Sequence, residues 1–148
     1  MEQEKIRKFR DTIRKFEREM FFQNNLSCCT GVTLAQCHTL LEIENKGVIS
    51  VTELANCMSL DKSTVSRTID SLVNKGLINR EIPSDNRRMA QISLTEKGRQ
   101  TCDDINSRND RYIHDNLSNF TGMEQKELLN LFEKITNNMI QLRKTDQD

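Results

Sequence analysis

The sequence predicts a mainly α-helical protein with one small β-hairpin. Its 148 residues include only one proline and five glycines, so few positions favour turns. Over most of the chain, apolar residues recur at spacings of three and four, as on one side of a helix. Between residues 77 and 94 the spacing changes to two, which is typical of strands. We expect a single domain over residues 1–148, with long helices flanking a compact middle.

The net charge of the chain does not by itself indicate a class of binding partner. Charged residues make up 30% of the sequence and cancel to a formal net charge of zero. Local excess positive charge within residues 49–99 still allows one basic face. No stretch approaches the roughly 18 apolar residues of a membrane span, and the charged N-terminus does not resemble a secretory signal. We expect a cytoplasmic protein without a membrane partner, whose cysteines are reduced unless they have a specific role.

The first predicted helix covers residues 2–22. Its apolar stripe, with charged residues between its members, is formed by Ile6, Phe9, Ile13, Phe16 and Met20. Such a stripe suits a seam with a second subunit, so we expect a homodimer joined through residues 1–30 and 100–148. Residues 23–31 are polar and are predicted to break the helix.

Three helices with recognisable N-terminal caps follow. A capping box pairs a Ser or Thr with a Glu or Gln three residues later, and a lone Asp can also cap a helix. The predicted caps and helices are Thr33 and Gln36 for residues 33–45, Ser50 and Glu53 for 51–58, and Asp61 for 62–75. The apolar face of the third helix, predicted to point into the core, consists of Val65, Ile69, Leu72 and Val73.

Two strands and two further helices complete the chain. Residues 77–82 and 89–94 are predicted strands joined by a polar loop, and residues 48–51 are long enough only for a bridging strand. Residues 95–118 and 122–143 are predicted helices, and Thr121 with Glu124 forms another capping box. The stripe of the last helix is Leu128, Leu131, Phe132, Ile135, Met139 and Leu142.

Residues 49–98, within an expected DNA-binding core of residues 31–99, have the element order of a winged helix-turn-helix, which binds DNA with the second of its two helices, here residues 62–75, in the major groove. The outward side of that helix consists of Lys62, Ser63, Thr64, Ser66, Arg67, Asp70, Ser71 and Asn74. Short hydroxyl side chains allow close approach to base edges, and Arg67 can bind guanine or phosphate. The helix N-terminus also suits a phosphate.

The hairpin loop contains Arg87 and Arg88, and an arginine at such a tip suits a narrow minor groove. Asp85 is expected to orient these arginines. Each feature alone is also compatible with an ordinary solvated surface. A winged-helix dimer that binds proteins, without specific DNA binding, is therefore the alternative function.

The middle of the chain resembles a known family. The segments that are similar to the DNA-binding core of MarR-family regulators are ISVTELA at 49–55, LDKSTVSRTIDSLVNKGLI at 60–78, DNRR at 85–88 and SLTEKG at 93–98.

The resemblance implies six helices and a wing, and interlocked terminal helices in a homodimer. It also implies a palindromic operator, a repressor released by a signal, and a ligand pocket between the dimerisation helices and the winged domain. Carried over by position, the DNA contacts would come from Ser63, Thr64, Ser66, Arg67 and Arg87, with Asp85 bracing the wing.

A group of cysteines lies outside the motifs of that resemblance. Cys28, Cys29 and Cys37 surround the start of the second helix, next to His38. Thiolates bind soft metals or metalloids and react with oxidants, so this cluster is a candidate sensor and the one candidate metal site. No other cofactor is expected.

The alternatives for these residues remain open. Cys37 could pack as a small apolar residue, and the effector could be an apolar or aromatic small molecule. Cys57 and Cys102 are expected to be structural. A cysteine–histidine nucleophile has no supporting glycine-rich loop or carboxylate partner in the sequence, so we do not expect an enzyme.

Overall fold

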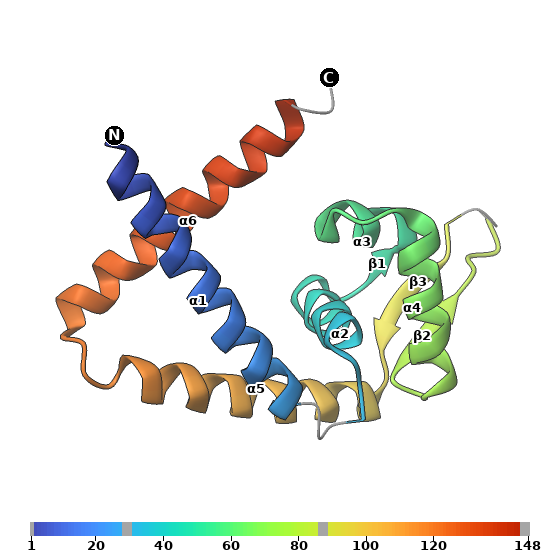
Figure 1. Ribbon diagram of the computed structural model, residues 1–148. Helices are drawn as coiled ribbons and strands as arrows, with labels where there is room; N and C mark the ends of the chain where they lie inside the picture. Colours follow the sequence, from blue (N-terminus) through green and yellow to red (C-terminus); the bar gives the residue numbers. More distant parts are fainter. Residues whose placement is uncertain (1, 28–30, 86–88, 146–148) are drawn as a thin grey trace. The chain divides into compact units, whose positions relative to one another are not determined.

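The computed structural model describes residues 2–27, 31–85 and 89–145, and the chain divides into two compact units, Met1–Arg108 (unit 1) and Asn109–Asp148 (unit 2). The first half of α5 belongs to unit 1, and the second half, with α6, belongs to unit 2. The elements within the described residues are α1 (Gln3–Ser27), α2 (Leu34–Lys46), β1 (Ile49–Ser50), α3 (Val51–Met58), α4 (Lys62–Asn74), β2 (Ile78–Glu81), β3 (Gln91–Leu94), α5 (Glu96–Leu117) and α6 (Gly122–Thr145) (Figure 1).

The helix starts follow the predicted capping chemistry. In three capping boxes, the side chain of each residue accepts a hydrogen bond from the backbone N–H of the other residue. The pairs are Thr33 and Gln36, Ser50 and Glu53, and Thr121 and Glu124. Each box supplies acceptors to N–H groups that have no partner within their own helix. The sequence therefore determines where α2, α3 and α6 begin.

Helix α1 is longer than predicted. It continues to Ser27, so the predicted break over residues 23–31 is wrong for residues 23–27. This segment contains neither glycine nor proline, and polar composition alone does not end a helix. Helices α1 and α6 contain no buried residue in their described parts, and Ile6, Phe9 and Ile13 are exposed. Among the described helices, none combines the length and apolar content that a membrane crossing requires.

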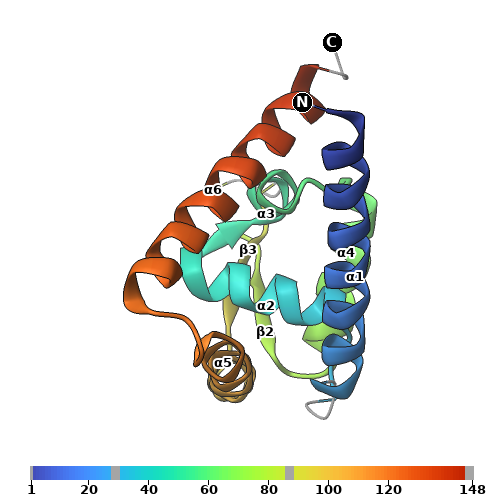
Figure 2. The same ribbon diagram turned by 60° about the vertical axis from the view of Figure 1, so that its left-hand side comes forward.

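The core of unit 1 lies among α2, α3, α4, the sheet and the start of α5 (Figure 2). Helix α4 contributes Val65, Ile69 and Leu72, which are almost fully buried as predicted. Val73 was also predicted to face the core, but it is 37% exposed. At about 100° per residue, Val73 lies roughly 70° from the centre of the buried face, which places it at the edge.

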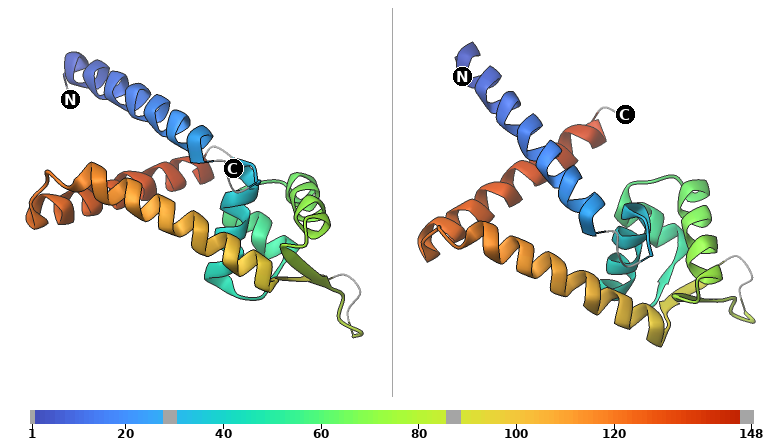
Figure 3. Two further views of the ribbon diagram at one scale, coloured as in Figure 1. Left: turned by 90° about the horizontal axis from the view of Figure 1, so that it is seen from below. Right: turned by 60° about the horizontal axis from the view of Figure 1, so that its bottom comes forward.

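The strands form a three-stranded antiparallel sheet in the order β1-β3-β2. The predicted bridging strand is β1, in which Ile49 is opposite Ile92 of β3. Strands β2 and β3 run side by side as a hairpin that extends away from α2 and α5 (Figure 3). Both are shorter than predicted, and Ile82 and Met89 lie exposed beyond the last cross-strand pair. The helices α3 and α4 with this hairpin make the predicted winged helix-turn-helix.

Gly98 allows α5 to pack closely against the backbone of Leu77, the residue directly before β2. A Cβ atom at this position would lie 1.9 Å from the carbonyl oxygen of Leu77, which accepts a hydrogen bond from the backbone N of Thr95 at 3.0 Å. The clash would be with backbone, which cannot rotate away as a side chain can. Glycine is therefore required here for space.

We predict that Gly98→Ala lowers the free energy of unfolding by about 1–3 kcal/mol or more, because the added methyl group overpacks this contact. Urea denaturation followed by circular dichroism would measure the change. Gly122→Ala is the matched control, because nothing lies within 4 Å of a Cβ at Gly122. Equal stability of the two variants would contradict the packing role of Gly98.

Candidate nucleic-acid interface

Helix α4 presents a polar stripe to solvent. Residues separated by four, three and four positions share one side of a helix. The exposed stripe, opposite the three buried apolar residues, is Ser63, Arg67, Asp70 and Asn74. Lys62 is exposed in the first turn, and Thr64 and Ser66 are half-buried along the flanks of the stripe. All the predicted DNA-contacting residues of this helix therefore lie on or beside its solvent side.

Asp61 occupies the N-terminus of α4. One carboxylate oxygen accepts hydrogen bonds from the Ser63 hydroxyl and from the backbone N of Thr64 at 2.8 Å, and the other accepts from the Thr64 hydroxyl at 2.7 Å. These bonds, led by the one from Ser63, hold the pKa of Asp61 well below its ordinary value. The carboxylate is therefore ionised at neutral pH. The carboxylate thus satisfies one backbone N–H at the helix N-terminus, the position suggested for a phosphate.

Arg67 is linked to the same cap through Thr64. Its Nη2 donates to the Thr64 hydroxyl oxygen at 3.4 Å, a long hydrogen bond. Thr64 thus stands between a carboxylate and a guanidinium group, one turn of helix apart. This hydrogen bond connects Arg67 to the N-terminal cap of the helix.

An ion pair that the sequence analysis missed joins α4 to the wing. Arg80 Nη1 in β2 lies 2.7 Å from Asp70 Oδ1 on the stripe. The side chains are 37% and 61% exposed, so the pair contributes at most about 1 kcal/mol to stability. On the exposed stripe, the pair neutralises the charge of one carboxylate. The polar side of the strand contained Arg80, but only the packing of α4 against β2 identifies its partner.

Hydrogen bonds join the C-terminal end of α4 to the first turn of α2 and to the segment before it. Buried Gln36 donates from Nε2 to the Ser71 hydroxyl at 2.8 Å. Lys75 Nζ donates to Gln36 Oε1 at 2.8 Å and to the carbonyl oxygen of Gly31 at 2.7 Å. Ser71, predicted to point outward, is therefore half-buried and bonded to the neighbouring helix.

The wing is described only in part. Asp85 is exposed and accepts a hydrogen bond from the Ser84 hydroxyl at 3.0 Å. Arg87 and Arg88 lie outside the described residues. Their contact with DNA, and the bracing role of Asp85, stay predictions.

The predicted cysteine cluster is also described only in part. Cys28 and Cys29 lie outside the described residues. Cys37 is half-buried and packs against the core, whereas its neighbour His38 is exposed and lines a surface pocket. Within residues 2–27, 31–85 and 89–145, no three His, Cys, Asp or Glu side chains are arranged to hold a metal ion. A metal role for Cys28, Cys29 and Cys37 stays a prediction.

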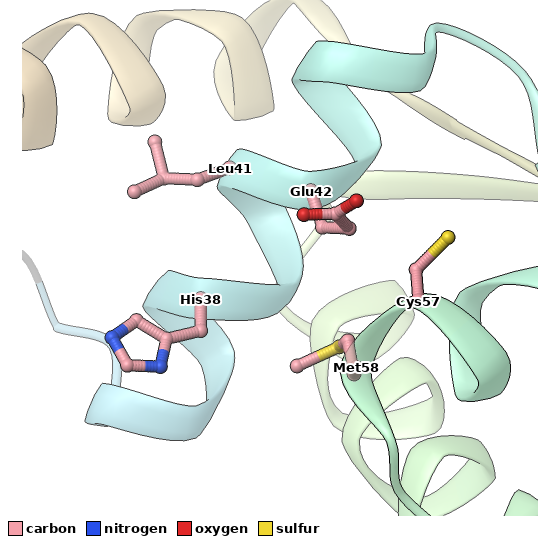
Figure 4. Close-up of a pocket in the computed structure, with 5 residues that line it drawn as sticks. All are labelled: His38, Leu41, Glu42, Cys57 and Met58. Carbon is pink, nitrogen blue, oxygen red and sulfur yellow. The ribbon is translucent and has the colours of Figure 1, made fainter. Parts of the chain in front are cut away.

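That pocket lies between α2 and α3 and has a volume of about 340 Å³. Its lining residues are His38, Leu41 and Glu42 from α2, and Cys57 and Met58 from α3 (Figure 4). The prediction of a packed, structural Cys57 is wrong, because this thiol is exposed at the pocket. Its position near the end of a short helix with few inward-facing positions could have suggested exposure.

Cys102 has the structural character expected of it. It is fully buried on α5, and burial, followed by the charges of Glu44 and Cys37, raises the pKa of its thiol to about 12. At neutral pH the thiol is protonated and out of contact with solvent, which makes it unreactive.

Comparisons with known proteins agree with this geometry. The MarR family model matches residues 32–89. The chain is 23% identical over 111 residues to the uncharacterized HTH-type transcriptional regulator YdgJ of Bacillus subtilis (strain 168), a match that spans 75% of this chain and 68% of YdgJ.

Solved structures extend the similarity beyond the winged helix. A MarR family protein from Bacillus stearothermophilus has a TM-score of 0.82 at 20% identity, and the match covers 95% of this chain and 99% of that one. A mutant of MarR from E. coli, complexed with operator DNA, has a TM-score of 0.72 at 26% identity, with 89% and 95% covered. Residues 32–89, which contain the helix-turn-helix and wing, thus match the MarR family model, and the fold of the chain is similar to that of solved MarR structures.

Proposed function

We propose that this regulator is a sequence-specific DNA-binding protein rather than an enzyme, and that it acts in the cytoplasm as a repressor released by a signal. The observation that supports this most directly is the polar stripe of α4, which is exposed because the opposite side of the helix is buried. The proposed operator is a palindrome with two half-sites about one helical turn apart, bound by a homodimer.

In the proposed complex, α4 lies in the major groove. Lys62, Ser63 and Arg67 would approach base edges and phosphates, with Thr64 and Ser66 beside them. Arg87 and Arg88 would enter the adjacent minor groove at the wing, with Asp85 bracing the loop. The similarity to E. coli MarR, whose structure was solved with operator DNA, supports this placement.

The proposed dimer uses the terminal helices. Three apolar side chains of α1, Ile6, Phe9 and Ile13, are spaced at three and four residues and are exposed. Helix α6 exposes Met139 and Leu142. Exposed apolar stripes of this kind are suited to helix packing between subunits.

If Arg67 contacts a base, we predict that Arg67→Ala weakens binding to the selected operator by about 1–3 kcal/mol. The preference for this operator over unrelated DNA should fall as well. Fluorescence anisotropy with both duplexes, at several salt concentrations, would measure this. Arg10→Ala is the matched control, since it removes an arginine from α1, outside the interface.

A uniform loss on all duplexes would instead make Arg67 a phosphate contact. Wild-type protein without salt-dependent affinity for any duplex would contradict the proposed function. That result would favour the alternative, a winged-helix dimer that binds proteins.

We predict that Phe9→Glu shifts the protein from dimer to monomer, because a charge would replace an apolar side chain within the subunit seam. Sedimentation equilibrium at micromolar concentration would detect the change. Arg10→Glu, one residue further along the same helix, should remain dimeric. If Phe9→Glu leaves the dimer intact, the α1 stripe is not at the subunit interface.

Two kinds of signal are proposed for release from DNA. An oxidant, or a soft metal or metalloid, would act at Cys28, Cys29 and Cys37. A small apolar or aromatic ligand would act at a pocket such as the one between α2 and α3, where His38 is exposed and Leu41 and Met58 supply apolar surface.

We predict that hydroperoxide or arsenite releases the wild-type protein from DNA, and that Cys28→Ser/Cys29→Ser abolishes this response. Cys57→Ser is the control, because the Cys57 thiol is exposed, and buried Cys102 should stay unalkylated in all folded proteins. Gel shifts and mass spectrometry after thiol labelling would measure release and modification. Equal release of wild-type and doubly substituted protein would show that Cys28 and Cys29 are not the sensor and that the cysteine cluster is structural.

A further inference from the structure

The hydrogen bonds at the start of α4 determine which way two hydroxyl groups are polarised. Ser63 and Thr64 both bond to the carboxylate of Asp61. An ionised carboxylate only accepts hydrogen bonds, so each hydroxyl must donate its single proton to it. What these hydroxyls can offer to a further partner is therefore a lone pair and not a proton.

The two hydroxyls differ in what remains available. Thr64 is half-buried, and its oxygen already accepts from Arg67. Ser63 is exposed and lies on the stripe with Arg67 and Asp70. Ser63 is therefore the residue of this pair that can present an acceptor to a ligand in front of α4.

In the major groove, hydrogen-bond acceptors outnumber donors. Guanine N7 and O6, adenine N7 and thymine O4 are acceptors, as are the phosphate oxygens. The donors are the amino groups of adenine (N6) and cytosine (N4). An acceptor-only Ser63 is compatible with the amino groups and repelled by the other atoms.

We propose that Asp61 is a specificity-determining residue: by holding the Ser63 hydroxyl as an acceptor, it makes α4 select an amino-bearing base at one position of each half-site. This inference rests on the proposed function, DNA binding by α4. It reverses the usual expectation that a serine on such a helix donates to a phosphate. The negative charge of Asp61 acts in the same direction, because it repels a phosphate from the helix N-terminus.

The first test uses duplexes selected by the wild-type protein from a randomised pool. Single adenines are replaced by purine and single cytosines by 2-pyrimidinone, both of which lack the amino group. At one position per half-site, we expect wild-type affinity to fall about three- to tenfold, the effect of one hydrogen bond. Ser63→Ala should be insensitive to the same replacement. Thr101→Ala, which removes a hydroxyl from α5, should respond as the wild type does.

The second test changes the polarity without removing the serine. Asp61→Gly removes both acceptor oxygens, so the Ser63 hydroxyl proton is freed, and glycine is also among the favoured N-cap residues. We expect the preference for the amino-bearing base to fall about three- to tenfold, with a gain for thymine or guanine at that position. Circular dichroism would verify folding, and if Asp61→Gly does not fold, Ser63→Ala with the base analogues still decides.

The outcomes separate the two claims. If the wild-type protein selects a sequence, but Ser63→Ala responds to every lost amino group as the wild type does, this inference alone is overturned. The same holds if folded Asp61→Gly retains the wild-type base preference. Failure of the wild-type protein to select or bind any duplex would overturn the proposed function, and this inference with it.

Discussion

The burial of one side of α4 determines which side chains this helix presents to solvent. Val65, Ile69 and Leu72 pack against the core among α2, α3 and the sheet. Burying a side chain of this size stabilises the fold by about 1.5–3 kcal/mol, more than a surface ion pair or a single cap contributes. These three residues therefore set the rotation of the helix. A rotation by one residue would bury polar groups, so Ser63 and Arg67 must face solvent.

A face that is expected to meet phosphates also contains two carboxylates, which the fold accommodates through local partners. Asp61 is surrounded by donors from its own helix, and Asp70 is paired with Arg80 from β2. Each arrangement has a second effect on geometry, because the first orients hydroxyl groups and the second joins α4 to the wing strand. Because both carboxylates have partners, a chain with zero net charge can still expose a cationic side chain, Arg67, on the stripe of α4.

The local sequence was sufficient to predict most of the helices and strands, whereas the contacts between them were not predicted. Capping boxes located the starts of three helices, and the alternation of Ile92 and Leu94 located a strand. The predicted break at residues 23–27 was wrong because polar composition alone does not end a helix. The exposed position of Cys57 was missed because inward and outward faces of a two-turn helix are poorly separated by spacing.

By itself, the sequence determined the order of the elements, the buried side of α4 and the set of side chains on its outer side, because these depend on neighbours within a few residues. The tertiary structure decided which of those side chains remain available. Ser71 is held by Gln36 and Asp70 by Arg80, partners that are 35 and 10 positions away in the chain. Hydrogen bonds and ion pairs act over about 3 Å, and only the packing of α4 on α2 and β2 brings these groups within that distance.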